Sequence, residues 1–153
     1  MTQETKPFKI LSIDGGGIKG LYSAIILQHL EEEFCKKEGK SISDYFDMIC
    51  GTSTGGLISL ALSIKTPASQ IVNFYKKRGK NIFPNYTNYQ KLIRKLQQLI
   101  GRGKYNNQDL KSEIETIVGD KTMADSHNLL CIPAFNITKG APTVWKFPHK
   151  EGN

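Results

Sequence analysis

The run from Gly51 to Gly56, Gly-Thr-Ser-Thr-Gly-Gly, joins two apolar segments of different character. Residues 46–50 have the length of a strand, whereas residues 57–62 have helical apolar spacing. A Gly-x-Ser-x-Gly turn between a strand and a helix is typical of a nucleophile elbow, in which flanking glycines let the backbone segments approach closely. The run therefore predicts Ser53 as a nucleophile, with the elbow formed by Gly51, Thr52, Thr54 and Gly55.

A second glycine run, residues 14–20, follows the apolar segment 8–13 and precedes a helical pattern. Gly15, Gly17 and Gly20 satisfy the Gly-x-Gly-x-x-Gly pattern of dinucleotide-binding folds. That fold expects an acid at the end of the second strand, but here the second strand runs directly into Gly51. A phosphate loop like that of sugar kinases is another alternative for this run, and neither alternative accounts for residues 51–56.

An acyl-transfer site accounts for both glycine runs. Attack of Ser53 on an ester carbonyl develops an oxyanion, which needs backbone N–H groups already directed at it. The amides of Gly15, Gly16 and Gly17 are suited to this role, together with the Thr54 amide at the start of the following helix. We therefore expect the two runs to face each other.

The pair of runs resembles the signature of the patatin-like phospholipases, and the likeness continues through residues 81–84, 104–105 and 132–135. The resemblance implies an α/β fold, the patatin-type three-layer sandwich with a largely parallel central sheet. It also implies hydrolysis of phospholipids without a cofactor or metal. By resemblance, Ser53 is the nucleophile and Gly15, Gly16 and Gly17 are the oxyanion donors, while the glycine-loop motif is completed by Asp14, Lys19 and Gly20.

The general base of that family has no counterpart in this sequence. The family pairs its serine with an aspartate in a later Asp-Gly-Gly or Asp-Gly-Ala motif, and the only Asp-Gly here is Asp14-Gly15. We therefore interpret residues 1–153 as the N-terminal portion of a single patatin-like catalytic domain, incomplete at the C-terminus, with the aspartate beyond Asn153. Because a serine without a base is a poor nucleophile, we expect this portion alone to be inactive.

Two alternatives remain open at this stage. Ser53, Asp125 and His149 occur in the order of an α/β-hydrolase triad, although only two strands fit before the elbow, whereas that fold has several. In the second alternative, the chain is a non-catalytic module that binds nucleotides or membranes and retains the glycine loops.

Hydrophobic periodicity predicts strands alternating with helices, which favours a largely parallel sheet. The first helix has Leu21, Ile25, Leu30 and Phe34 on its apolar side, with Ile18, Ala24 and Ile26 filling in, and it ends at Gly39. Another helix, 68–77, ends at Gly79. The remaining elements are strands at 8–13, 43–50, 129–135 and 143–147, and helices at about 55–64, 91–100 and 110–118, the last capped by Gln108 or Asp109. Pro133 suggests a strand end, bulge or edge.

The formal charge of +7 comes from one region. Ten basic residues and no acidic ones lie between Lys65 and Lys104, whereas the other 11 basic residues are outnumbered by 14 acidic ones. This basic segment, 65–104, suits an anionic membrane surface or a nucleotide activator, or it is simply a solvated face. No recognisable module accompanies it, so nucleic acid is not expected as a partner.

The first residues of the chain and its cysteines indicate the cellular compartment. Residues 1–6 are polar and lack the apolar block of a secretory signal. Three cysteines without close spacing predict free thiols rather than a disulfide framework. We expect a cytoplasmic protein, with peripheral contact at the membrane as a further expectation.

Overall fold

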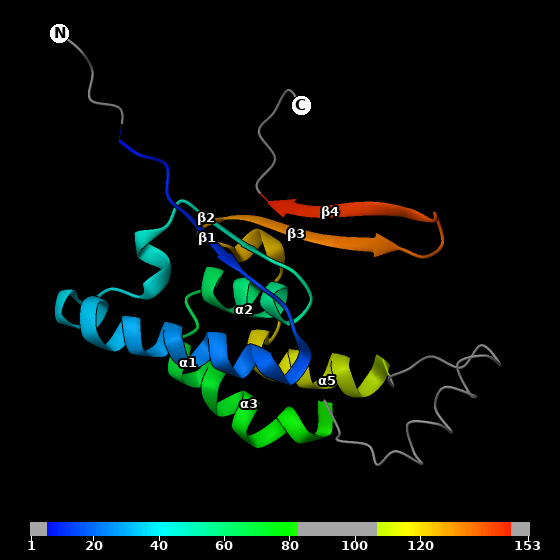
Figure 1. The fold of residues 1–153 in the computed structure, drawn as a ribbon, viewed down its shortest axis with the longest axis horizontal. Helices are drawn as coiled ribbons and strands as arrows, with labels where there is room; N and C mark the ends of the chain where they lie inside the picture. Colours follow the sequence, from blue (N-terminus) through cyan, green and yellow to red (C-terminus); the bar gives the residue numbers. More distant parts are fainter. Residues whose placement is uncertain (1–5, 83–106, 148–153) are drawn as a thin grey trace, which may run out of the picture.

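The computed structural model describes residues 6–82 and 107–147 of the chain. Its centre is a four-stranded sheet in the order β1-β2-β3-β4 (Figure 1). The first three strands are parallel and β4 pairs antiparallel with β3. Their bounds are Ile10–Ile13 for β1, Met48–Gly51 for β2, Leu129–Asn136 for β3 and Ala141–Phe147 for β4. The predicted α/β fold with a largely parallel sheet is confirmed.

The described helices cover one face of the sheet (Figure 1). Right-handed crossovers between strands that follow one another in the sheet put every connecting helix on the same side. The covered face carries a row of paired residues in which Ile49 and Leu130 are fully buried, with Leu11 and Phe147 at its ends. On the opposite face of β1, Ile10 is 54% exposed. The second helical layer implied by the resemblance stays a prediction.

Helix α2, Thr54–Ser63, is the most buried helix described, and eight of its ten residues are buried. It contacts all three parallel strands on one side and α1, α3 and α5 on the other. These three helices span Gly20–Leu30, Ala68–Ile82 and Asn107–Val118. Apolar and small residues all round α2 suit this central position, because a helix without a polar face is stable only when it is buried.

The predicted strand 43–50 is partly wrong. Residues Ile42–Tyr45 form a 3-10 turn, η4, and β2 begins only at Met48. The reason is a capping box in which the Asp44 carboxylate accepts from the Ser41 N–H at 2.8 Å and from the Ser41 hydroxyl at 2.9 Å. Helical capping therefore prevails over strand propensity at this position.

Two predicted helix bounds also change. Helix α3 continues through Gly79 to Ile82, since a single glycine costs an interior helical turn only about 1 kcal/mol. Helix α5 begins at Asn107, before either predicted cap. The predicted helix 91–100 lies outside the described residues, as does most of the basic segment 65–104.

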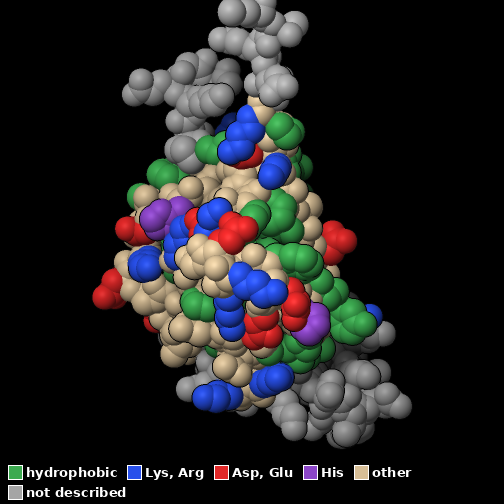
Figure 2. Space-filling view, turned by 90° about the vertical axis from the view of Figure 1, so that its left-hand side faces the viewer, with side chains coloured by type: hydrophobic (Ala, Val, Ile, Leu, Met, Phe, Trp, Pro, Cys, Tyr) green, Lys and Arg blue, Asp and Glu red, His purple; other side chains and the backbone are tan. Residues whose placement is uncertain are grey.

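Helix α1 turns only part of its predicted apolar side to the core, where Ala24 is buried and Leu21 packs against the core as predicted. Its buried positions include the small residues Gly20 and Ala24 with Leu27, which allow close packing on α3. The other residues predicted on that side, Ile18, Ile25, Ile26, Leu30 and Phe34, are instead exposed, and so is Tyr22. Figure 2 shows hydrophobic side chains gathered along the right-hand edge of that view.

The first helix does end at Gly39 as predicted. A π-helical turn (Glu31–Cys35) and a 3-10 turn (Lys36–Glu38) precede Gly39, which is left-handed at φ 67°.

The strand predicted at 8–13 begins only at Ile10, whereas two further local predictions agree with the structure. Cys35, Cys50 and Cys131 are free thiols. Pro133 lies in β3 beyond Cys131, where β2 pairing stops and β4 is the only described neighbour, so its missing N–H is tolerated at an edge. Among the described helices, none is both long and apolar enough to cross a bilayer.

Candidate active site

Ser53 stands at the tip of the turn between β2 and α2. Its backbone has φ 54° and ψ −123°, a conformation that is costly for a residue with a side chain and is found where surrounding structure enforces it. The residue is exposed, whereas Thr54, Gly55 and Gly56 behind it are buried. A Cβ on Gly51 would collide with the carbonyl group of Gly55, so the sharp turn requires glycine there. The local geometry is that of a nucleophile elbow.

The first glycine run lies directly against this turn, as predicted. A Cβ on Gly15 would lie 2.8 Å from the Ser53 Cβ and closer still to the Thr52 carbonyl oxygen. From the other side, a Cβ on Gly55 would collide with the Ile13 carbonyl. Three backbone segments therefore pack directly against one another at Gly15, Gly51 and Gly55, beyond the carboxyl ends of β1 and β2.

The amides of the glycine run differ in what they bind. Gly15 N–H donates to the Thr52 hydroxyl at 3.3 Å, and Gly16 N–H donates to the Thr54 hydroxyl at 3.1 Å. Gly17 is the first residue of the 3-10 turn η1, Gly17–Lys19, and Thr54 is the first residue of α2. Within residues 6–82 and 107–147, neither of these two N–H groups has an acceptor, as is usual at a helix start. They are the donors open to a ligand in this form.

Tyr75 supports the loop from beneath, a role that the sequence reasoning missed. This α3 residue is 4% exposed, and a Cβ on Gly20 would lie 2.7 Å from its hydroxyl and 3.1 Å from the Thr54 hydroxyl. Burial raises the pKa of the Tyr75 hydroxyl, and its hydrogen bond with Thr54 opposes that shift. The sequence offered no signal beyond a tyrosine on an otherwise apolar helix side.

The two charged residues of the glycine-loop motif lie at the surface. Asp14, directly after β1, and Lys19, in η1, are both exposed. The Lys19 N–H closes the turn by donating to the Gly16 carbonyl at 3.2 Å. Lys19 therefore shapes the loop through its backbone and leaves its ammonium group towards solvent.

No carboxylate or imidazole of the described residues hydrogen-bonds to Ser53. Asp125 accepts from the Thr122 N–H at 2.7 Å and caps the 3-10 turn η5, Met123–Asp125. That turn precedes β3, which begins opposite Met48, at the other end of β2 from Ser53. The structure thus does not bring Asp125 to Ser53, and His149 lies outside the described residues. In the described part of the chain, no three His, Cys, Asp or Glu side chains are grouped to hold a metal ion.

Comparison with known proteins agrees with this geometry. A family model described as patatin-like phospholipase matches residues 11–151. Patatin-like protein 1 of Arabidopsis thaliana is 34% identical over 145 residues, which cover 89% of this chain and 35% of the plant protein. A protein of Escherichia coli strain TW11681 named cGAMP-activated phospholipase is 33% identical over 145 residues, covering 92% of this chain and 40% of that protein. The chain therefore spans well under half the length of these relatives.

Proposed function

Because this chain belongs to the patatin-like phospholipase family, we propose that it carries the nucleophile and oxyanion-binding portion of a lipid acyl hydrolase. The observation that carries the proposal is the strained Ser53 at the elbow tip, lying against the backbone of Gly15. A strained backbone and closely approaching glycines both cost stability, and an acyl-transfer site gives each of them a use. The substrate class is glycerophospholipid.

In the proposed reaction, the Ser53 hydroxyl oxygen bonds to the ester carbonyl carbon of the lipid while its proton passes to a base. The oxyanion accepts hydrogen bonds first from the free Gly17 and Thr54 amides. Gly15 and Gly16 join them once the Thr52 and Thr54 hydroxyls give up their N–H groups. Each such donor accelerates acyl transfer by roughly 10²- to 10³-fold.

Collapse of the tetrahedral intermediate breaks the ester bond, and the leaving alcohol takes up the proton. The acyl group then remains on Ser53 until water, activated by the same base, releases the fatty acid. We propose that the base is an aspartate supplied beyond Asn153, so that residues 1–153 alone turn over little substrate. No cofactor takes part in this scheme.

The proposal predicts that a fluorophosphonate labels Ser53 in the full-length protein. Ser53→Ala should lower fatty-acid release from phospholipid vesicles by at least about 10⁴-fold, since removing a serine nucleophile forfeits covalent catalysis. The matched control is Ser12→Ala, an exposed serine on β1, which should retain both labelling and activity. Unchanged hydrolysis by Ser53→Ala would overturn the proposal and favour the non-catalytic binding module.

We also propose a nucleotide activator and peripheral contact with an anionic membrane, in a cytoplasmic setting. Relatives from Escherichia coli and Vibrio cholerae, 33% and 32% identical, are named cGAMP-activated phospholipases. The basic segment 65–104 suits anionic ligands, although Lys65 is already ion-paired with Asp44. Fatty-acid release should rise when cGAMP is added to the full-length protein. An equal rate with and without cGAMP, together with no heat of binding, would contradict the activator.

A further inference from the structure

Two of the three cysteines are paired in register on neighbouring strands. Cys50 of β2 lies opposite Cys131 of β3 in the parallel part of the sheet. Neighbouring strands are about 4.8 Å apart, and paired residues project from the same face of the sheet. A disulfide needs Cα atoms roughly 4.4–6.8 Å apart. The register therefore holds two thiols within bridging distance, and both are free in this structure.

The two thiols interact with each other. Burial raises the pKa of the Cys50 thiol, and the charge of the Cys131 thiolate and a hydrogen bond with Cys131 raise that pKa further. Charges of thiol groups affect one another in this way only when the sulfur atoms are close. The side chains of Cys50 and Cys131 are therefore turned towards each other, as formation of a bond between them requires.

The pair lies on the face of the sheet that the described helices leave open. Ile49 and Leu130, which precede the two cysteines, are fully buried against the helices. Because side chains alternate along a strand, Cys50 and Cys131 project from the opposite face. Both are only half-buried, whereas Cys35 is 1% exposed. In the part of the chain that the structure describes, a dissolved reagent therefore reaches the pair but not Cys35.

A lysine lies beside the pair on the same face. Lys146 of β4 is exposed and lies directly opposite Cys131 in the antiparallel part of the sheet. Directly opposed residues have neighbouring side chains on one face. The ammonium group of Lys146 attracts anionic solutes to Cys131, and glutathione disulfide, which carries more carboxylates than ammonium groups, is such a solute.

We propose that Cys50 and Cys131 form a reversible disulfide by exchange with an anionic small-molecule disulfide of the glutathione type. The Cys131 thiolate bonds to one glutathione sulfur and breaks the S–S bond, so that the first glutathione leaves. The Cys50 thiolate then bonds to the Cys131 sulfur and displaces the second glutathione. Two electrons pass from the cysteines to glutathione disulfide, and the two thiol protons end on the two glutathione molecules. A solvent-exposed bridge of this kind is readily reduced again by thiols.

The bridge acts on the elbow because Cys50 immediately precedes Gly51. The Cβ atoms of a disulfide are about 3.8 Å apart, less than the spacing of about 4.8 Å between strands, so closure draws Cys50 towards β3. Gly51 is packed against the backbone of Gly55, and a shift of one therefore displaces the turn that carries Ser53. The oxidised form holds Ser53 away from its reactive position, a consequence that rests on the proposed function.

Peptide mapping of the full-length protein tests the bridge without requiring hydrolysis. After incubation with glutathione disulfide, an unreduced digest should contain peptides linked through Cys50 and Cys131, and dithiothreitol should separate them. Cys35 should remain a free thiol, and Cys131→Ala should give no linked peptides. Recovery of Cys50 and Cys131 as free thiols after this treatment would overturn the proposal. Protection of both from iodoacetamide, as a second layer over this face would give, would overturn it as well.

Fluorophosphonate labelling of Ser53 tests the consequence separately. The bridged protein should be labelled at least about tenfold more slowly than the reduced protein, since a displacement of about 1 Å at a reacting group has effects of this size. Dithiothreitol should restore the rate, and Cys131→Ala should be labelled equally before and after oxidation. An unchanged rate in the bridged protein would overturn the effect on the elbow. If Ser53 is not labelled even in the reduced protein, the proposed function fails, whereas linked peptides would still establish the bridge.

Discussion

At the carboxyl end of the sheet, the loops after β1 and β2 and the start of α2 meet backbone to backbone, with glycine where side chains would collide. The Thr52 and Thr54 hydroxyls also bridge these loops by accepting from the Gly15 and Gly16 N–H groups. At the amino end, the contacts between segments rely on polar side chains rather than on glycines. There, Asn128 donates to the carbonyl oxygens of Ser43 at 3.0 Å and Phe46 at 2.7 Å, and the Lys9 N–H donates to the Asp47 carboxylate at 2.7 Å. The segments at the two ends of the sheet are therefore held together by different kinds of contact.

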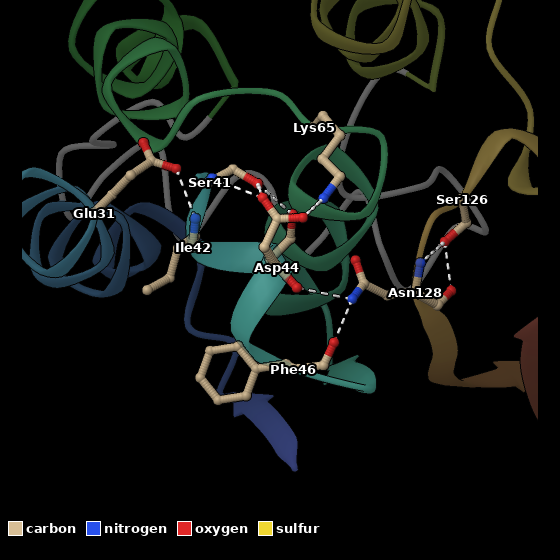
Figure 3. Close-up of polar contacts among 9 residues, drawn as sticks. Glu31, Ser41, Ile42, Asp44, Phe46, Lys65, Ser126 and Asn128 are labelled. Carbon is tan, nitrogen blue, oxygen red and sulfur yellow. Dashed lines mark hydrogen bonds and ion pairs between the residues drawn. The ribbon is translucent and has the colours of Figure 1, made fainter. Parts of the chain in front are cut away.

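The polar contacts of the amino end form a connected group around η4 (Figure 3). Glu31, 5% exposed, accepts from the Ile42 N–H at 3.1 Å and from the Ala68 N–H at 2.9 Å, and so caps the starts of η4 and α3 together. Asp44 accepts from Ser41 and from the Lys65 ammonium group. Side chains here use up backbone donors that would otherwise be left without partners.

Under the proposed function, the difference follows from the backbone N–H groups that each end must leave free for a ligand. A site for an oxyanion needs N–H groups that no side chain has permanently taken, and glycine exposes them to a substrate. The amino end has no such demand, so its donors are satisfied internally. In open α/β sheets, ligands bind beyond the carboxyl ends of the strands, which is where the glycine-built end lies.

The largest effect should come from placing a side chain in the glycine-built end. Gly55→Ala puts a methyl group against the Ile13 carbonyl and 3.0 Å from the Asp14 carbonyl carbon, both backbone atoms that cannot rotate away. We expect a loss of about 3 kcal/mol or more in the free energy of unfolding, measured with urea. Gly140→Ala is the control, because a Cβ there meets nothing within 4 Å and only its φ of 61° opposes the change, at about 1 kcal/mol. Equal losses in both variants would mean that crowding is not what requires Gly55.

This same crowding made the carboxyl end predictable from sequence. The close approach of backbone segments requires residues without a Cβ at Gly15, Gly51 and Gly55. Because this property depends only on residue type, the spacing of the glycines alone indicated the turn and the facing loop. The strained backbone of Ser53 followed from the same pattern. What the spacing left open was which amides are free, because the threonine hydroxyls that bind Gly15 and Gly16 rotate according to tertiary contacts.

A smaller loss should follow from changing the side-chain-built end at its buried carboxylate. Glu31→Gln keeps the shape but replaces one acceptor oxygen with an NH₂ group, which faces the N–H of Ile42 or Ala68. We expect a cost of about 2 kcal/mol in the free energy of unfolding from the unsatisfied buried donor. Glu33→Gln, an exposed position on the same helical turn, should stay within about 0.5 kcal/mol of the parent. If Glu31→Gln left the free energy of unfolding unchanged, backbone contacts alone would hold this end.

The amino end could not be read from the sequence. Glu31 bonds to Ala68, 37 positions away, and Asn128 bonds to Ser43, 85 positions away, so no local pattern links them. Part of the apolar side predicted for the first helix was wrong for a related reason. Close packing on α3 selects the side with Gly20 and Ala24, and this preference for small residues outweighs the area of Ile25 and Phe34. Contacts made by partners distant in sequence decided both cases.

The smallest effect, and the one that pH can resolve, concerns Asp44. The hydrogen bond from Lys65 is the largest of the contacts that lower the pKa of Asp44 from 3.8 to about 2. A lowered pKa means that the carboxylate stabilises the fold above about pH 4 and that this contribution is lost as the pH falls towards 2. Because the side chain is 34% exposed, solvent screening limits the loss in Asp44→Asn at pH 7 to roughly 1 kcal/mol. Urea unfolding at pH 7 and pH 3 should show the gap to the parent narrowing at pH 3. The exposed Asp120→Asn control should show no gap at either pH, and a gap for Asp44→Asn that stays the same at both pH values would contradict the lowered pKa of Asp44.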